Sequence, residues 1–144
     1  MTIVQHFVGG ARIPGGDRQS PVFNPNDGQV ARRVLLGDRA VLDLAVEKAA
    51  AAQPGWARVN PQRRSRVLFE YKRLVELHLD ELAHLLSSEH GKVLGDARGD
   101  VQRGLDVIEF ACGIPHALKG EYTQGAGPGI DVYSMRQPLG VVAG

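Results

Sequence analysis

The stretch that decides the fold is GDARGDVQRGLDVIEFACGIPHALKGE, residues 95–121, in which apolar side chains recur at helical spacing. These apolar residues are Val101, Leu105, Ile108 and Cys112. Asp96 offers an N-cap, and Gly113 with Pro115 interrupts the pattern. The sequence therefore predicts one helix that begins near Asp96 and ends at Gly113.

Arg103 lies in this predicted helix, three residues from both Asp100 and Asp106. From the residues alone, two interpretations of Arg103 stay open. In the first, Arg103 forms surface ion pairs with these aspartates, which contribute only a few tenths of a kcal/mol. In the second, the guanidinium stands beside the apolar residues Val107 and Phe110 and binds a substrate carboxylate. The spacing by itself favours the ion pairs.

The chain before residue 38 predicts short strands, which we expect to form a small β-meander. The strands are expected at Gln5–Val8, Ala11–Ile13, Val22–Phe23 and Gln29–Leu36. Gly9 and Gly10 separate the first two with a two-residue hairpin signal. The cluster Asn24-Pro25-Asn26-Asp27-Gly28 is a turn before the last strand.

Three further helices are predicted between this meander and residue 95. Their boundary signals are Asp38 and Pro54-Gly55 for the first, Asn60-Pro61 for the start of the second, and Asp80 and Gly91 for the third. With the helix at 96–113, the middle of the chain predicts about four helices in succession.

Beyond Glu121 the sequence predicts extended structure. We interpret GAGPG at 125–129 as a flexible loop and not as a dinucleotide-binding loop, because the pattern shows no strand before it and no helix after it. Ile130–Gln137 is expected to be extended, and Leu139–Ala143 has the composition of a buried parallel strand. Such a strand needs hydrogen-bonded neighbours, so we expect a chain that is cut short after Gly144.

The composition excludes several classes of function. The 144 residues are 43% hydrophobic and 23% charged with a net charge of +1, which argues against nucleic-acid binding. We therefore expect Arg58, Arg63, Arg64 and Arg66 to form a solvated patch. No apolar run reaches the roughly 20 residues of a membrane span, and the amino terminus lacks a signal or transit pattern. We expect a cytoplasmic protein that binds neither nucleic acid nor membrane.

Cys112 is the single cysteine, so the sequence predicts neither an internal disulfide nor a cysteine-based zinc site. We interpret Cys112 as a buried structural thiol, because no activating charge adjoins it. His78, His84 and His90 recur every six residues, a spacing that at the helical period rotates each one away from the last. We therefore expect no metal site.

The run EFACGIPHALKGE at Glu109–Glu121, together with PLGVVAG at Pro138–Gly144, resembles the methylmalonate-semialdehyde (malonate-semialdehyde) dehydrogenases. This group is the coenzyme A-acylating branch of the aldehyde dehydrogenase superfamily. Asn24-Pro25, Trp56 and the Glu89-x-Gly91-Lys92 pattern are similar to features of the wider superfamily. An aldehyde dehydrogenase of another substrate specificity therefore stays open as an alternative.

The resemblance implies an α/β fold, namely the amino-terminal part of the aldehyde dehydrogenase fold. Residues 1–144 would be an incomplete amino-terminal segment of the NAD-binding domain, truncated before the dinucleotide-binding sheet. Residues 130–137 would belong to the oligomerisation region, which implies a homo-oligomer. The glycine-rich cofactor region, the catalytic cysteine and the general-base glutamate of the family would lie beyond residue 144, so we expect these residues alone to bind neither NAD nor coenzyme A.

For the complete enzyme, the resemblance implies NAD-dependent oxidation of methylmalonate or malonate semialdehyde to an acyl-CoA with loss of carbon dioxide. The reaction would pass through a cysteine thiohemiacetal and a thioester. Arg103 would face the substrate tunnel and orient the carboxylate of the semialdehyde. Residues 1–144 alone are expected to be inactive, and a non-catalytic, self-associating chain is the alternative of a different class.

Overall fold

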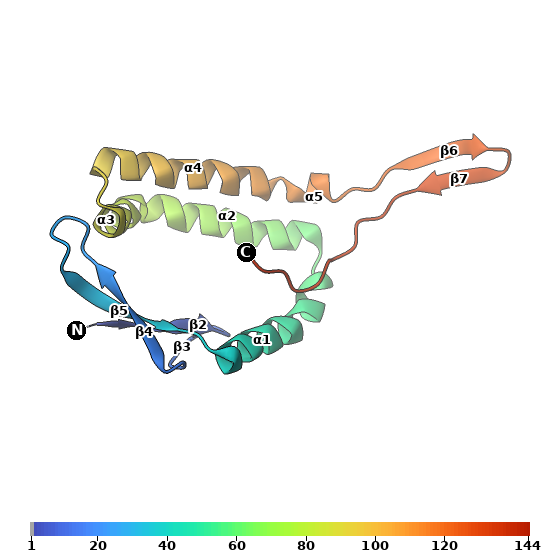
Figure 1. Ribbon diagram of the computed structural model, residues 1–144. Helices are drawn as coiled ribbons and strands as arrows, with labels where there is room; N and C mark the ends of the chain where they lie inside the picture. The colour runs from blue at the N-terminus through green and yellow to red at the C-terminus, as the bar shows by residue number, and fades with distance from the viewer. Residues whose placement is uncertain (1) are drawn as a thin grey trace.

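The computed structural model describes residues 2–144 and shows two layers with an extended hairpin (Figure 1). One layer holds the strands β1 to β5 and helix α1, and the other holds the helices α2 to α5. The strands of the first layer are β1 (Ile3–Val4), β2 (His6–Val8), β3 (Ala11–Ile13), β4 (Arg18–Phe23) and β5 (Val30–Leu36). The hairpin consists of β6 (Tyr122–Gly127) and β7 (Ile130–Tyr133). This mixed architecture confirms the predicted α/β class.

The four predicted strands of the first layer are present, but they do not form one continuous meander. β2 and β3 pair as a separate antiparallel hairpin, while β5 lies between β1 and β4 in a three-stranded sheet. β1 runs parallel to β5 and β4 antiparallel to it. Gly9 and Gly10 have φ of 61° and 83°, the left-handed values that a two-residue hairpin turn requires.

Helix α1 (Arg39–Ala57) begins where the sequence predicts and ends later than predicted. The Asp38 carboxylate accepts a hydrogen bond of 2.9 Å from the Val41 amide, as an N-cap does. Pro54, expected to end the helix, lies inside it. A proline removes one backbone hydrogen bond, but it does not prevent one further turn after it.

Helix α2 (Pro61–Leu77) confirms its prediction, because Asn60 accepts a hydrogen bond of 2.8 Å from Gln62 and Pro61 occupies the first helical position. Helix α3 (Leu79–His90) ends as predicted at Gly91, whose φ is 80°. Asp80 is not its N-cap, since the helix begins at Leu79. The Asp80 carboxylate instead accepts a hydrogen bond of 2.9 Å from Arg98 in the next helix.

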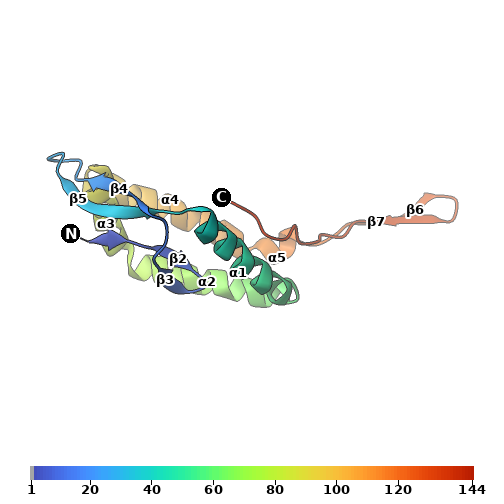
Figure 2. The same cartoon turned by 60° about the horizontal axis from the view of Figure 1, so that its bottom comes forward.

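Helix α4 (Leu94–Cys112) begins two residues before the predicted cap, so Asp96 lies in its first turn. A carboxylate there still stabilises the helix through its dipole. Gly113 ends α4 as predicted, and the short α5 (Ile114–Ala117) follows it directly. Figure 2 shows α4 running along α2, and Lys72 of α2 joins the two helices by an ion pair of 3.4 Å to Glu109.

The core is small and lies within the helical layer. Among the described residues, the buried apolar side chains are Ala83, Ala97, Leu105 and Cys112. Ala83 of α3 and Ala97 of α4 are completely buried, which lets these two helices approach closely. The burial predicted for Cys112 is confirmed, with 6% of the residue exposed.

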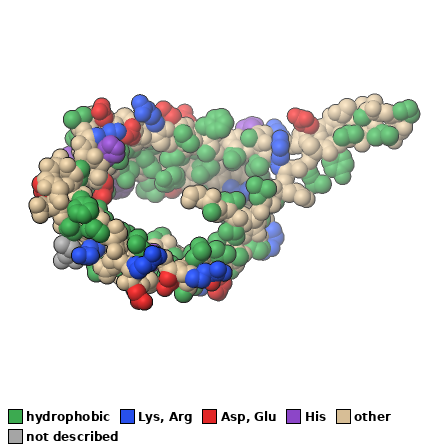
Figure 3. All heavy atoms as spheres, viewed as in Figure 1, with side chains coloured by type: hydrophobic (Ala, Val, Ile, Leu, Met, Phe, Trp, Pro, Cys, Tyr) green, Lys and Arg blue, Asp and Glu red, His purple; other side chains and the backbone are tan. Residues whose placement is uncertain are grey.

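The chain exposes far more surface than a compact protein of its size. Its accessible surface is 11067 Å², whereas a compact monomer of 15.5 kDa exposes roughly 7,200 Å². Figure 3 shows an open hollow between the helical layer and the layer of strands and α1, with apolar side chains along its rim. Most of the apolar surface of the helices therefore has no partner within residues 2–144.

The glycine-rich segment GAGPG is not a flexible loop, because it forms the end of a β-hairpin. Gly125 and Gly127 belong to β6, and β7 begins at Ile130. Pro128 and Gly129, with φ of 70° at the glycine, supply the residue types of a type II turn. Figures 1 and 2 both show this hairpin projecting away from the body of the molecule.

The strand expected at Leu139–Ala143 does not form. Leu139 is 93% exposed, and no strand of the described chain lies beside this segment to supply hydrogen bonds. The segment returns toward α1 instead, where Val141 and Val142 line a shallow pocket with Trp56. Of the extended stretch 130–137, only Ile130–Tyr133 is a strand.

Candidate functional site

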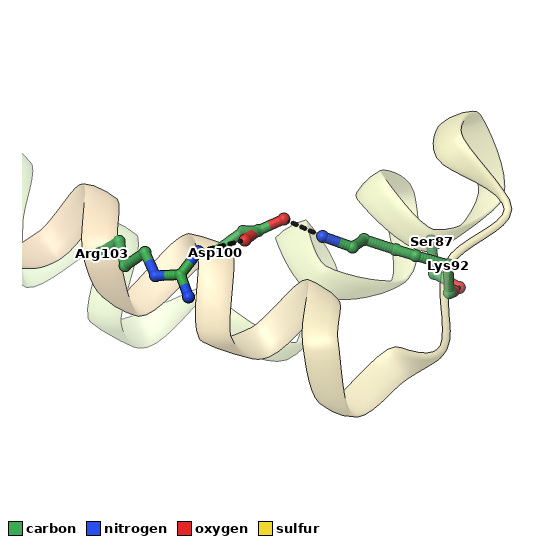
Figure 4. A network of polar contacts seen from close by, with 4 residues as sticks. All are labelled: Ser87, Lys92, Asp100 and Arg103. Atoms are coloured by element: carbon green, nitrogen blue, oxygen red, sulfur yellow. Dashed lines mark hydrogen bonds and ion pairs between the residues drawn. The ribbon is translucent and has the colours of Figure 1, made fainter.

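Arg103 lies on the outer side of α4 and makes one contact to an acidic residue of the described chain. Its Nη1 atom lies 3.3 Å from Oδ1 of Asp100, and 83% of its side chain is exposed (Figure 4). Asp106, the other predicted partner, accepts a hydrogen bond of 3.0 Å from Gln102 instead. In these 144 residues the arrangement is therefore the surface ion pair, formed with one of the two aspartates.

The contact between Arg103 and Asp100 uses a single nitrogen of the guanidinium. An arginine carries five N–H donors in a planar fork, so Nε and Nη2 stay available to a second acceptor. A carboxylate binds such a fork by two parallel hydrogen bonds. The ion pair with Asp100 thus leaves Arg103 able to bind a carboxylate ligand.

An exposed apolar strip follows Arg103 along α4. Val107 is one turn further on and 68% exposed, and Phe110 is 85% exposed. A helix normally turns such side chains toward a packing partner, because burying each one stabilises the fold by about 1.5–3 kcal/mol. A partner that covers Val107 and Phe110 would also reduce the solvent around Arg103.

Asp100 connects Arg103 to Lys92 in the turn between α3 and α4. The Lys92 ammonium forms an ion pair with Oδ2 of Asp100, while Arg103 contacts Oδ1 (Figure 4). Hydrogen bonding from Lys92 is the main reason that the pKa of the Asp100 carboxyl lies below its usual range. In the sequence, Lys92 stands out only as part of the Glu89-x-Gly91-Lys92 pattern. Eight positions separate it from Asp100, so no helical spacing links the two.

The position of Lys92 is fixed by the turn that carries it. Ser87 donates a hydrogen bond of 2.7 Å from its hydroxyl to the Lys92 carbonyl. Gly91, just before it, is left-handed, and a Cβ atom at this position would lie 2.9 Å from Cβ of Pro25. Only a glycine fits this turn without strain, so Gly91 and Ser87 together direct the Lys92 side chain toward α4.

A surface pocket of about 850 Å³ lies elsewhere on the helical layer, between the start of α2 and the end of α4. Its lining includes Asn60, Ser65, Phe69, Glu109, Cys112 and His116. The Ser65 hydroxyl is already bonded to the Gln62 carbonyl at 2.9 Å. Arg103 does not line this pocket, so the two features are separate.

Within residues 2–144 there is neither a metal-binding cluster nor a membrane-spanning helix. No three His, Cys, Asp or Glu side chains of this range are grouped to hold a metal ion, and His78 instead lies 2.9 Å from Glu81. No helix of the range is long and apolar enough to cross a membrane.

Comparison with known proteins identifies the family. The aldehyde dehydrogenase family model matches residues 13–144. Malonate-semialdehyde dehydrogenase of Pseudomonas aeruginosa is 41% identical over 144 residues, which are 100% of this chain and 29% of that protein. The human mitochondrial methylmalonate-semialdehyde/malonate-semialdehyde dehydrogenase [acylating] is 38% identical over 98% of this chain and 26% of that protein.

Solved structures give the same result. A putative methylmalonate-semialdehyde dehydrogenase from Sinorhizobium meliloti 1021, complexed with NAD, superposes with a TM-score of 0.92 and 52% identity over 97% of this chain and 29% of that chain. The methylmalonate-semialdehyde dehydrogenase of Oceanimonas doudoroffii superposes with a TM-score of 0.92 and 40% identity, over 96% and 28%. The chain thus spans less than a third of the length of these relatives, matches their amino-terminal part, and belongs to the aldehyde dehydrogenase family.

Proposed function

We propose that residues 1–144 form the amino-terminal part of an NAD-dependent, coenzyme A-acylating dehydrogenase of methylmalonate or malonate semialdehyde. The support is the identity of 52% to the S. meliloti structure over 97% of this chain and of 41% to the P. aeruginosa enzyme over 100% of it. The complete enzyme would oxidise the semialdehyde and release carbon dioxide, and the product would be an acyl-CoA.

The cofactors would bind to other parts of the complete enzyme. A dinucleotide site needs a glycine-rich loop between a strand and the N-terminus of a helix. The candidate glycine-rich segment, GAGPG at 125–129, lies in the β6–β7 hairpin and does not fit this requirement. We therefore propose that NAD and coenzyme A do not bind to these residues alone and that the 144-residue chain has no dehydrogenase activity.

Within the complete enzyme, we assign substrate binding to Arg103. The observation that carries this proposal is the single-nitrogen contact to Asp100, which leaves two further nitrogens of an exposed guanidinium for a carboxylate. The adjoining apolar side chains of Val107 and Phe110 are exposed, and in the complete enzyme other segments would pack on them. A desolvated guanidinium binds a carboxylate much more strongly than one in water.

The experiment that tests this function compares two substrates of the complete enzyme. With NAD and coenzyme A present, kcat/KM is measured for methylmalonate semialdehyde and for propanal, which has no carboxylate. We expect a clear preference for the carboxylated substrate. Equal use of both aldehydes would contradict the substrate assignment, and turnover by the 144-residue chain would contradict its proposed inactivity.

We also propose that the protein forms a homo-oligomer through the β6–β7 hairpin and residues 130–137. The hairpin projects from the body, and Tyr122, Ile130, Val132 and Tyr133 are each more than half exposed. Its outer strand edges have unpaired backbone groups, which can pair with a strand of another copy.

A further inference from the structure

Two positive side chains and one negative side chain form a single network at the junction of α3 and α4. Both oxygens of Asp100 are engaged, Oδ2 by Lys92 and Oδ1 by Arg103 (Figure 4). Lys92 is the shielded member, with 21% of its side chain exposed, and Arg103 is the solvent-facing member, with 83% exposed. Lys92 is therefore held within the structure, whereas Arg103 is accessible to a ligand.

We propose that Lys92 and Asp100 are positioning residues for Arg103, in that Lys92 anchors and neutralises Asp100, which then orients the guanidinium without cancelling its charge. This inference rests on the proposed role of Arg103 in binding a substrate carboxylate. Lys92 and Asp100 themselves touch no substrate.

The charge balance explains why Lys92 is needed. Alone, Asp100 would pair with Arg103 and leave no net positive charge for a substrate carboxylate. It would also repel that carboxylate at short range, because like charges a few ångströms apart cost free energy wherever solvent is reduced. With Lys92 bound to Asp100, the network keeps one net positive charge, and Arg103 is the group that presents it.

The geometry shows how the arrangement is held in place. The Lys92 backbone is fixed by the Ser87 hydrogen bond, so its ammonium is brought to α4 from a separate element. Asp100 is one helical turn before Arg103 and accepts a hydrogen bond from one guanidinium nitrogen at 3.3 Å. The carboxylate thereby restricts the rotamers of a long side chain, which reduces the entropy cost of binding a ligand.

The test uses the complete enzyme and the Lys92→Met variant, which removes the charge and keeps most of the side chain. We expect KM for methylmalonate semialdehyde to rise on the order of tenfold. We expect kcat/KM for propanal to change by less than about twofold, since a neutral aldehyde does not respond to the freed carboxylate. The matched control is Lys92→Arg, which keeps the charge and should stay close to wild type on both substrates.

A double-mutant cycle separates this role from a structural one. In the Asp100→Asn background there is no carboxylate to neutralise, so Lys92→Met should have no further effect on the KM ratio of the two substrates. An equal loss on both substrates, or the same loss in the Asp100→Asn background, would overturn the inference. If Lys92→Met does not fold, Lys92→Gln takes its place in the same cycle.

The Arg103→Leu variant distinguishes failure of this inference from failure of the proposed function. If Arg103→Leu affects both substrates equally, the substrate role of Arg103 is wrong. If Arg103→Leu reduces activity on the carboxylated substrate alone and Lys92→Met does not, only the positioning roles of Lys92 and Asp100 are wrong.

Discussion

Arg32 of β5 and Glu89 of α3 form an ion pair of 2.7 Å that joins the strand layer to the helical layer. Pro25 and Gly91 approach each other in the same region, where the turn before β5 meets the end of α3. The two layers thus meet at the end of α3, and the Lys92 turn that leads to Asp100 follows directly from this junction. Changes at the junction are therefore expected to affect both stability and the Arg103 network.

The Gly91→Ala variant is expected to destabilise the complete enzyme by about 1–3 kcal/mol, because alanine is strained at a φ of 80°. The added Cβ would also lie 2.9 Å from Pro25. The measurement is a thermal or denaturant unfolding midpoint. The matched control is Gly99→Ala in α4, where no atom of residues 2–144 lies within 4 Å of the added Cβ and alanine should stabilise the helix by about 0.5–1 kcal/mol. A Gly91→Ala variant as stable as Gly99→Ala would contradict the structure of this turn.

Arg103→Leu in the complete enzyme is expected to weaken the use of methylmalonate semialdehyde by about 2–5 kcal/mol in kcat/KM, the order seen when one member of a desolvated charge pair is removed. Propanal should be nearly unaffected. Arg103→Lys keeps the charge but lacks the planar fork, so we expect an intermediate loss. Steady-state kinetics on both aldehydes measure these effects. No selective loss would favour the surface ion pair as the whole role of Arg103.

At acid pH, protonation of Asp100 is expected to break its ion pairs with Lys92 and Arg103. The pKa of Asp100 is lowered in the folded state by Lys92, so its stabilising contribution is complete above the unfolded value of about 3.9 and is lost as pH falls through the folded value. The difference in unfolding midpoint between wild type and Asp100→Asn should therefore be constant from about pH 5 to 7 and shrink below about pH 4. A difference that grows on acidification would reverse this sign and contradict the assigned contact.

We expect the 144-residue chain to form a dimer or higher oligomer in solution, as measured by light scattering. Val132→Lys on the exposed hairpin should shift the population toward the monomer, because a charge on an edge strand opposes pairing with another copy. Ala50→Lys on the exposed surface of α1 serves as the control and should leave the population unchanged. A monodisperse monomer of the unmodified chain at high concentration would count decisively against association.

Local signals in the sequence predicted most of the elements correctly. Three of these signals act through backbone groups only a few residues away, namely Asn60-Pro61, Gly91 and the Gly9-Gly10 hairpin. Their effect can therefore be predicted without the rest of the fold. The resemblance carried by Glu109–Glu121 and Pro138–Gly144 likewise led to the correct family. The same resemblance implies the substrate role of Arg103, which stays a prediction.

The tertiary structure alone decided which distant groups meet. Asp80 binds Arg98 instead of capping α3, and Lys92 reaches Asp100 across the α3–α4 turn. Residues 125–129 form the end of a hairpin because β6 and β7 pair with each other. Leu139–Ala143 forms no strand because no strand of residues 2–144 lies beside it. Caps and turns depend on neighbours along the chain, but strand pairing and ion pairs between helices depend on packing that brings separate segments together.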